Sequence, residues 1–151
     1  MSSFTEFDER MMRLAMEEAQ LARAQGEVPV GAVIVRNGEI VARAHNTREQ
    51  AHDPTGHAEI NALRQAAQAT NTWRLEGCVL YVTLEPCGMC ASAIGQSRLS
   101  RVVFGAYDHQ AGCCGSVYRL TEDPAFTWYV PADGGLLRKE CEQLIRAFPG
   151  R

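Results

Sequence analysis

Two short segments of the sequence carry residue types that bind metal ions and transfer protons. The first, at residues 57–59, supplies the imidazole of His57 and the carboxylate of Glu59, and the second supplies the thiols of Cys87 and Cys90. One nitrogen and two thiolates form a three-ligand set for Zn²⁺, and a catalytic zinc keeps its fourth position open for water. Three protein ligands rather than four therefore favour a catalytic zinc site.

Glu59 is suited by its position to act as the base of such a site. It lies two residues after His57, and at the start of a helix both side chains can point into one cleft. Two thiolates offset the charge of zinc, so a neighbouring base helps to deprotonate water there. We expect Glu59 to take that proton and to pass it to a leaving nitrogen, which is the chemistry of hydrolytic deamination. The H-x-E and P-C-x-x-C pair is a known signature of zinc nucleobase deaminases.

A C-x-x-C segment alone is also typical of redox sites and of structural zinc sites. The redox reading is disfavoured because this segment opens no thioredoxin-like βαβ pattern. A structural or regulatory zinc site leaves Glu59 without a purpose. The chain has six cysteines, but it is long enough to build a core and carries no export signal. We therefore expect free thiols rather than disulfides.

The composition is that of one globular domain, and we assign residues 1–151 to a single zinc-dependent deaminase domain. The chain is 46% hydrophobic and 22% charged, and no apolar run approaches the roughly 20 residues that span a bilayer. Its N-terminal residues lack the basic start and apolar core of a secretion signal, so we expect a cytoplasmic protein without a membrane anchor. A net charge of −3 lowers the expectation of nucleic-acid binding without excluding a local basic patch.

The pattern along the chain predicts alternating helices and strands. We expect helices near residues 6–25, 59–69, 89–94 and 134–147, and strands near 28–35, 39–44, 79–84 and 101–105. Asn37-Gly38 predicts a tight hairpin between the first two strands. The later strands alternate with helices, which predicts an α/β fold with a mixed sheet covered on both faces. Residues 107–133 are rich in Gly, Pro, Cys and aromatic residues and receive no assignment.

Longer stretches of the sequence resemble the tRNA-specific adenosine deaminase family, within the cytidine deaminase-like superfamily. The matching segments are EVPVGAVIV (27–35), Asn46, HDPT (52–55), HAEI (57–60), WRL (73–75), LYVTLEPC (80–87), MCA (89–91), SR (97–98), RVVFGA (101–106) and Asp108. The resemblance implies a three-layer α/β/α fold with a five-stranded mixed sheet between helices. It implies one Zn²⁺ per subunit and a homodimer. It also implies conversion of adenosine to inosine at the wobble position of a tRNA anticodon stem-loop.

The resemblance also implies a role for individual residues. It makes His57, Cys87 and Cys90 the zinc ligands and Glu59 the proton shuttle. The residues it assigns to substrate binding are Asn46 on the target base, Val28, Val30 and Leu84 as pocket walls, and Asp108 near the ribose or the neighbouring nucleotide. By residue type alone, Asn46 is equally suited to a turn, Asp108 to a helix cap, and the three apolar residues to a core.

Several positions depart from the family pattern, and they keep a second function open. Gly56 and Gly88 stand where larger residues are usual, and Trp128 stands in place of a frequent histidine. Cys113 and Cys114 stand where small residues are usual, and the chain ends at FPGR without the basic extension of many members. These changes leave the predicted metal ligands intact, but they affect the part of the prediction that concerns RNA recognition. The alternative is deamination of a free nucleobase or nucleoside, such as guanine, cytosine or a purine analogue, at the same site.

Overall fold

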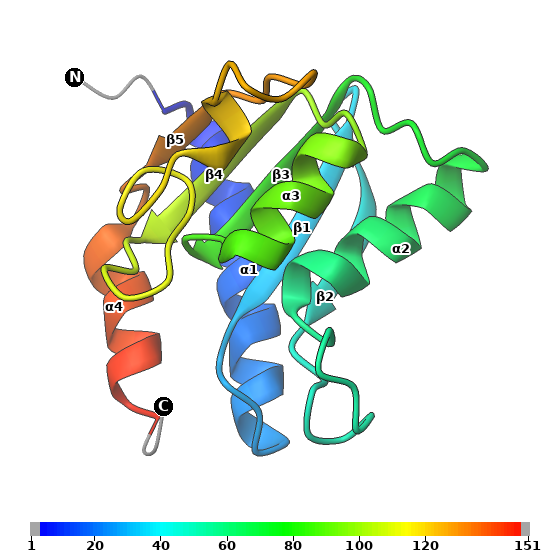
Figure 1. Ribbon diagram of the computed structural model, residues 1–151. Coiled ribbons are helices and arrows are strands. Elements are labelled where there is room, and N and C mark those ends of the chain that lie inside the picture. The colour runs from blue at the N-terminus through cyan, green and yellow to red at the C-terminus, as the bar shows by residue number, and fades with distance from the viewer. Residues whose placement is uncertain (1–3, 149–151) are drawn as a thin grey trace.

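The computed structural model describes residues 4–148 as helices packed on both faces of one sheet (Figure 1). Its helices are α1 (Glu6–Ala24), α2 (Ala58–Thr70), α3 (Gly88–Gln96) and α4 (Arg138–Arg146), with a 3₁₀ turn, η1, at Leu120–Glu122. Its strands are β1 (Gly31–Arg36), β2 (Glu39–His45), β3 (Cys78–Leu84), β4 (Arg101–Ala106) and β5 (Ala132–Gly134). The predicted residues 1–3 and 149–151 of the domain lie outside this description. No helix within residues 4–148 has both the length and the apolar character to cross a membrane.

The sheet is mixed, as predicted, with the strand order β2-β1-β3-β4-β5. Strand β1 runs antiparallel to β2 and β3, whereas β3, β4 and β5 run parallel. The predicted hairpin joins β1 to β2, and its turn residues Asn37 and Gly38 have φ angles of 52° and 78°. Positive φ at both central positions is what a type I′ turn requires.

Successive side chains of β1, β3 and β4 enter two separate hydrophobic cores. Ala32 and Ile34 of β1 pack toward α2 and α3, in one core cluster. Val33 and Val35 pack toward α1 and α4, in the other cluster. Both faces of the sheet are therefore buried, and the site must lie at an edge or at the ends of strands.

Two predicted element boundaries were wrong, and the backbone shows why. Strand β1 begins at Gly31 rather than Val28, because the Val30 amide bonds to the Val28 carbonyl at 2.8 Å in a tight local turn. The last helix begins at Arg138 rather than Gly134, because Gly134 ends β5 and Leu137 adopts a left-handed φ of 51°. The unassigned stretch 107–133 contains η1 and leads into β5.

Candidate zinc and substrate site

The predicted metal ligands meet where two helices begin. His57 is the N-cap residue of α2 and Cys87 is the N-cap residue of α3, and neither side chain caps its own helix. His57 Nδ1 lies 3.6 Å from Cys87 Sγ and 3.5 Å from Cys90 Sγ. The three ligand atoms lie within 4.8 Å of one another. One nitrogen and two sulfurs this close fit the donor set that zinc prefers.

The two cysteines have opposite pKa shifts when no metal ion lies between them. Hydrogen bonding from the Cys90 side chain lowers the pKa of Cys87 to about 4, against the opposing effect of burial. Hydrogen bonding to Cys87 also raises the pKa of Cys90 and, above all other causes, that of His57. A divalent cation among them favours thiolates and a neutral imidazole, because those are the forms that bind metal.

Glu59 lies in the first turn of α2 beside these ligands. Its side chain is buried, with 4% of the residue exposed. Burial raises the pKa of its carboxyl group to about 7, because a low-dielectric surrounding disfavours the charged form. A carboxyl group with this pKa can both accept and release a proton at neutral pH, as general acid–base chemistry requires.

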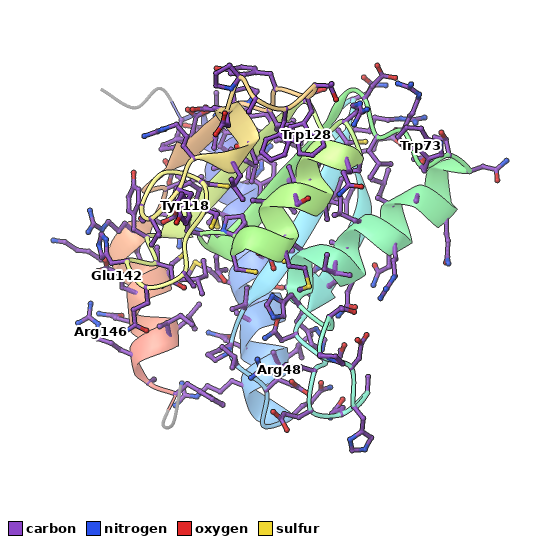
Figure 2. All side chains as sticks on the ribbon, viewed as in Figure 1. Arg48, Trp73, Tyr118, Trp128, Glu142 and Arg146 are labelled. Atoms are coloured by element: carbon purple, nitrogen blue, oxygen red, sulfur yellow. The ribbon has the colours of Figure 1, made fainter. Side chains whose placement is uncertain are left out.

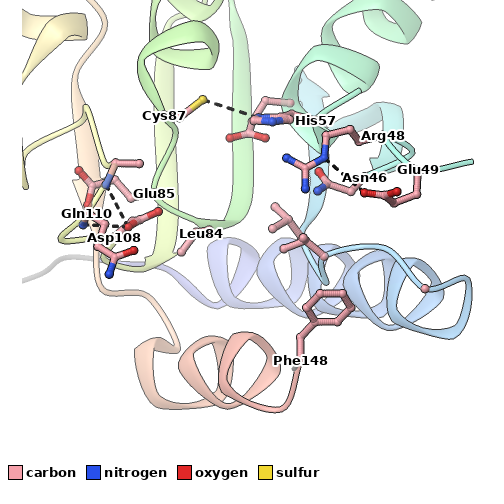
Figure 3. A pocket seen from close by; sticks show the side chains of 15 residues that line it. Asn46, Arg48, Glu49, His57, Leu84, Glu85, Cys87, Asp108, Gln110 and Phe148 are labelled. Carbon is pink, nitrogen blue, oxygen red and sulfur yellow. Dashed lines mark hydrogen bonds and ion pairs between the residues drawn. The ribbon is translucent and has the colours of Figure 1, made fainter. Parts of the chain in front are cut away.

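The ligands open onto a cavity of about 680 Å³ (Figure 3). All five residues that the resemblance assigns to substrate binding line this cavity, and so do His57, Glu59 and Cys87; the five are Val28, Val30, Asn46, Leu84 and Asp108. Cys90 is fully buried and does not line it. The residues that the sequence analysis singled out therefore come from five separate segments, which the fold places around one cavity.

Asn46 follows β2 directly and has a fixed orientation in this cavity. Its Oδ1 accepts a hydrogen bond from the Ala58 backbone N–H at 2.8 Å, at the start of α2. Because only the oxygen can accept that bond, the amide nitrogen must occupy the other position, where it meets no acceptor within residues 4–148. The oxygen of Asn46 thus caps the first turn of α2, a role that the sequence did not predict, and its nitrogen remains as a donor facing the cavity.

Asp108 likewise holds local backbone while it faces the cavity. Its Oδ1 accepts hydrogen bonds from the Gln110 and Ala111 backbone N–H groups at 3.0 and 3.2 Å. The capping role that its residue type suggested is therefore present, although the residues it caps form a turn rather than a helix.

Seven residues that line the cavity were not predicted. They are Gly26, Arg48, Glu49, Glu85, Gln110, Ala111 and Phe148. Figure 3 shows Arg48 beside His57 and Asn46, and Phe148 reaching toward the cavity from the end of α4. Glu85 could have been found from its place directly before Pro86-Cys87, since a charged residue at the end of a buried strand needs partners. The other six lie in loops or just after a helix, where the spacing of residues predicts no site.

Two of the unusual positions compensate for one another beside the metal ligands. A Cβ atom at position 88 would lie 3.7 Å from Cys113 Sγ. The side chain of Cys113, which is larger than usual, therefore lies next to Gly88, which lacks a side chain. Trp128 packs its indole ring against Gly95 of α3, where any Cβ would overlap the ring, and stacks on Phe126 with 4.6 Å between ring centroids. These substitutions are accommodated by packing and leave the three ligands in place.

A family model for the cytidine and deoxycytidylate deaminase zinc-binding region matches residues 5–106. That segment contains His57, Glu59, Cys87 and Cys90, so the class of protein is a zinc-binding deaminase. A tRNA-specific adenosine deaminase of Bacillus subtilis (strain 168) is 48% identical over 141 residues, which cover 93% of this chain and 88% of the relative. A tRNA-specific adenosine deaminase of Haemophilus influenzae is 46% identical over 145 residues, covering 95% and 84%. The chain belongs to the family of tRNA-specific adenosine deaminases.

A solved structure agrees with this assignment. The chain matches one from a study of A-to-I editing by tRNA:A34 deaminases at the wobble position of transfer RNA, with a TM-score of 0.87 and 40% identity. The match covers 89% of this chain and 98% of that one. The predicted three-layer α/β/α fold is therefore confirmed.

Proposed function

We propose that this protein deaminates adenosine to inosine at the wobble position of a tRNA anticodon. The observation that carries the proposal is the group of His57, Cys87 and Cys90 with Glu59 beside it, at the end of a cavity in a chain of this family. Zinc, when bound there, supplies Lewis acidity that activates water for attack on a base carbon bearing an amino group. The carboxyl group of Glu59 would hold and move the protons.

Each residue of the cavity receives a role from its position. We assign His57, Cys87 and Cys90 to the metal and Glu59 to proton transfer between water and the departing ammonia. The free Nδ2 donor of Asn46 is suited to an acceptor atom of the target base. Val28, Val30 and Leu84 supply apolar walls for its ring, and Asp108, which lines the same cavity, is assigned to the ribose or the next nucleotide.

The experiment uses a transcribed anticodon stem-loop with adenosine at the wobble position. We expect inosine in this RNA after incubation with the protein and none when that adenosine is moved into the stem. Free adenosine, cytosine and guanine serve as parallel substrates for the alternative function. Ammonia released from the free compounds alone, with no inosine in the RNA, would replace the tRNA proposal with the alternative.

We also propose a homodimer, as the family resemblance implies. An apolar groove lies between α2 and α3 and is lined by Leu63, Ala67, Met89 and Ala93, with Trp73 and Trp128 at its rim (Figure 2). Trp73 is 58% exposed, which is unusual for so large an apolar side chain. Sedimentation equilibrium should give twice the chain mass, and Trp73→Glu should shift the protein toward the monomer. A monomeric wild-type protein at micromolar concentration would refute the dimer.

Two further expectations remain proposals of the same kind. We propose that residues 1–151 form one deaminase domain, because both cores of residues 4–148 share the same sheet. We propose a cytoplasmic location, because that is where tRNA is the available substrate.

A further inference from the structure

Glu85 is a buried carboxylate that accepts hydrogen bonds from one loop. It follows the last residue of β3 and precedes Pro86-Cys87, and 2% of it is exposed. Its Oε1 accepts from the Asp108 backbone N–H at 3.0 Å, and its Oε2 accepts from those of Cys114 and Ser116 at 3.0 and 2.9 Å. The Ser116 hydroxyl donates a further bond to Oε1. Within residues 4–148 it forms no ion pair.

The loop 108–116 closes around this carboxylate. Gly112 lies against it so closely that a Cβ there would overlap the Glu85 carboxyl group and the Asp108 carbonyl oxygen. The Cys113 N–H donates to the Pro86 carbonyl at 2.8 Å, which ties the same loop to the residue before Cys87. Figure 3 shows Glu85 and Asp108 side by side on the wall of the cavity. The loop is therefore held by the segment that ends in a proposed metal ligand.

A buried carboxylate without a cationic partner costs free energy, because neutral donors only partly replace its hydration. An apolar residue at this position would avoid that cost but would leave three backbone N–H groups without acceptors. Glutamine would not serve either, because each of its two terminal positions faces an N–H donor and only one can carry an oxygen. The arrangement requires a carboxylate, and what that carboxylate fixes is the loop that carries Asp108.

We propose that Glu85 is a positioning residue, which sets where the 108–116 loop and its Asp108 stand relative to the metal ligands and thereby sets the affinity for the RNA substrate. This proposal rests on the proposed function, since it concerns the same cavity. Glu85 acts through the loop rather than on the reacting atoms. Loss of its carboxylate should therefore weaken substrate binding while the metal ligands and Glu59 keep their chemistry.

The test compares Glu85→Gln with Glu122→Gln in the anticodon stem-loop assay. Glu122 is a matched control, because its partly buried carboxylate also accepts a backbone N–H, that of Ala132 at 2.9 Å, but it does not line the cavity. We expect Glu85→Gln to raise KM about 10-fold, which corresponds to about 1.4 kcal/mol of lost binding free energy. The value of kcat at saturating RNA and the zinc content should stay near those of the wild type, and Glu122→Gln should leave KM unchanged.

Amide hydrogen exchange on the same proteins gives a second measurement that does not depend on activity. Glu85→Gln should lose protection either at Asp108 or at Cys114 and Ser116, depending on which N–H groups face its amide nitrogen, while α3 keeps its protection. Gly112→Ala tests the same contact with the charge retained, because its methyl group displaces the carboxylate, and it should raise KM in the same way.

Three results would overturn the proposal. They are an unchanged KM in folded Glu85→Gln, a loss of zinc together with kcat, and a failure of both the Glu85 and Gly112 variants to fold. If the wild type does not deaminate the stem-loop, the proposed function fails. The exchange pattern then decides separately whether Glu85 holds the loop.

Discussion

His57 and Cys87 occupy N-cap positions without capping their helices, and this is the residue-scale basis of the site. N-cap side chains usually bind the free backbone N–H groups of the first turn. Here Asn46 supplies an oxygen to α2 instead, at 2.8 Å from the Ala58 nitrogen. The imidazole is thereby free to face the two sulfurs, while the helix N-termini keep their preference for negative charge.

Glu59→Gln is expected to keep zinc and lose turnover. The amide cannot carry a proton between water and the leaving nitrogen, and general acid–base residues typically contribute about 100- to 10,000-fold to the rate. The measurement is single-turnover deamination of the anticodon stem-loop, with zinc content determined on the same samples. Activity within threefold of the wild type would exclude the shuttle role.

At the scale of elements, α1 is fixed to the sheet by a polar group as well as by its apolar face. Tyr81 of β3 donates to Asp8 Oδ1 at 2.6 Å, and Arg101 of β4 bridges Asp8 and Asp133 at 3.3 and 3.0 Å. Burial opposes ionisation of Asp8, but the bonds from Tyr81, Thr5 and Arg101 prevail and lower the pKa of this carboxyl group. These contacts hold α1 against the face of the sheet opposite α2 and α3.

The pH dependence of stability should reflect that lowered pKa. A carboxyl group with a depressed folded-state pKa stabilises the fold above its unfolded pKa of about 3.9 and loses this contribution as the pH falls through the folded value. Asp8→Asn should lower the free energy of unfolding at pH 7 by about 1.5–3 kcal/mol, the range for hydrogen bonds to charged groups. The free energy of unfolding of the variant should also fall less steeply below about pH 4 than that of the wild type. Urea denaturation at a series of pH values measures both effects.

The half-exposed Asp133 provides the control for that experiment, because it bonds the same arginine from a surface position. Asp133→Asn should change the free energy of unfolding by less than about 1 kcal/mol. An equal effect of both variants, or an unaltered acid limb in Asp8→Asn, would contradict the role assigned to Asp8.

The elements that the sequence predicted well are those with a strong local signal. The Asn37-Gly38 turn, the apolar β-branched run of β1, and the spacing of Cys87 and Cys90 each depend on residues close in the chain. The start of α4 was mispredicted because Leu137 continues an apolar pattern while its backbone is left-handed. Glu85 was missed as a loop anchor because its partners lie 23–31 residues away and are backbone groups.

On the scale of the whole molecule, an acidic chain must bind a polyanion. The net charge is −3, so attraction to RNA depends on local cations rather than on the overall field. Arg48 is the one arginine or lysine among the described residues that line the cavity. Within residues 4–148 its one ion pair is with Glu49, and that contact is long at 3.9 Å. It is therefore available to a phosphate beside the target nucleotide.

Arg48→Ala should weaken stem-loop binding and reduce its dependence on salt. Removing one phosphate contact lowers the slope of the logarithm of the association constant against the logarithm of salt concentration by about 1. It also weakens binding by a similar factor for every RNA sequence. The measurement is fluorescence anisotropy across a salt series. Arg13→Ala is the control, because Arg13 is exposed on α1, which packs on the other face of the sheet. Equal slopes for the wild type and Arg48→Ala would remove Arg48 from the RNA contact.

The central claim is that one imidazole and two thiolates hold a single zinc ion with a coordination position left for solvent. X-ray absorption spectroscopy at the zinc edge, on protein with its metal content determined, tests it most directly. We predict one zinc per chain with two sulfur neighbours near 2.3 Å and two nitrogen or oxygen neighbours near 2.0–2.1 Å, which are roughly the usual bond lengths. Protein without zinc, or a zinc ion with four sulfur neighbours, would contradict the account.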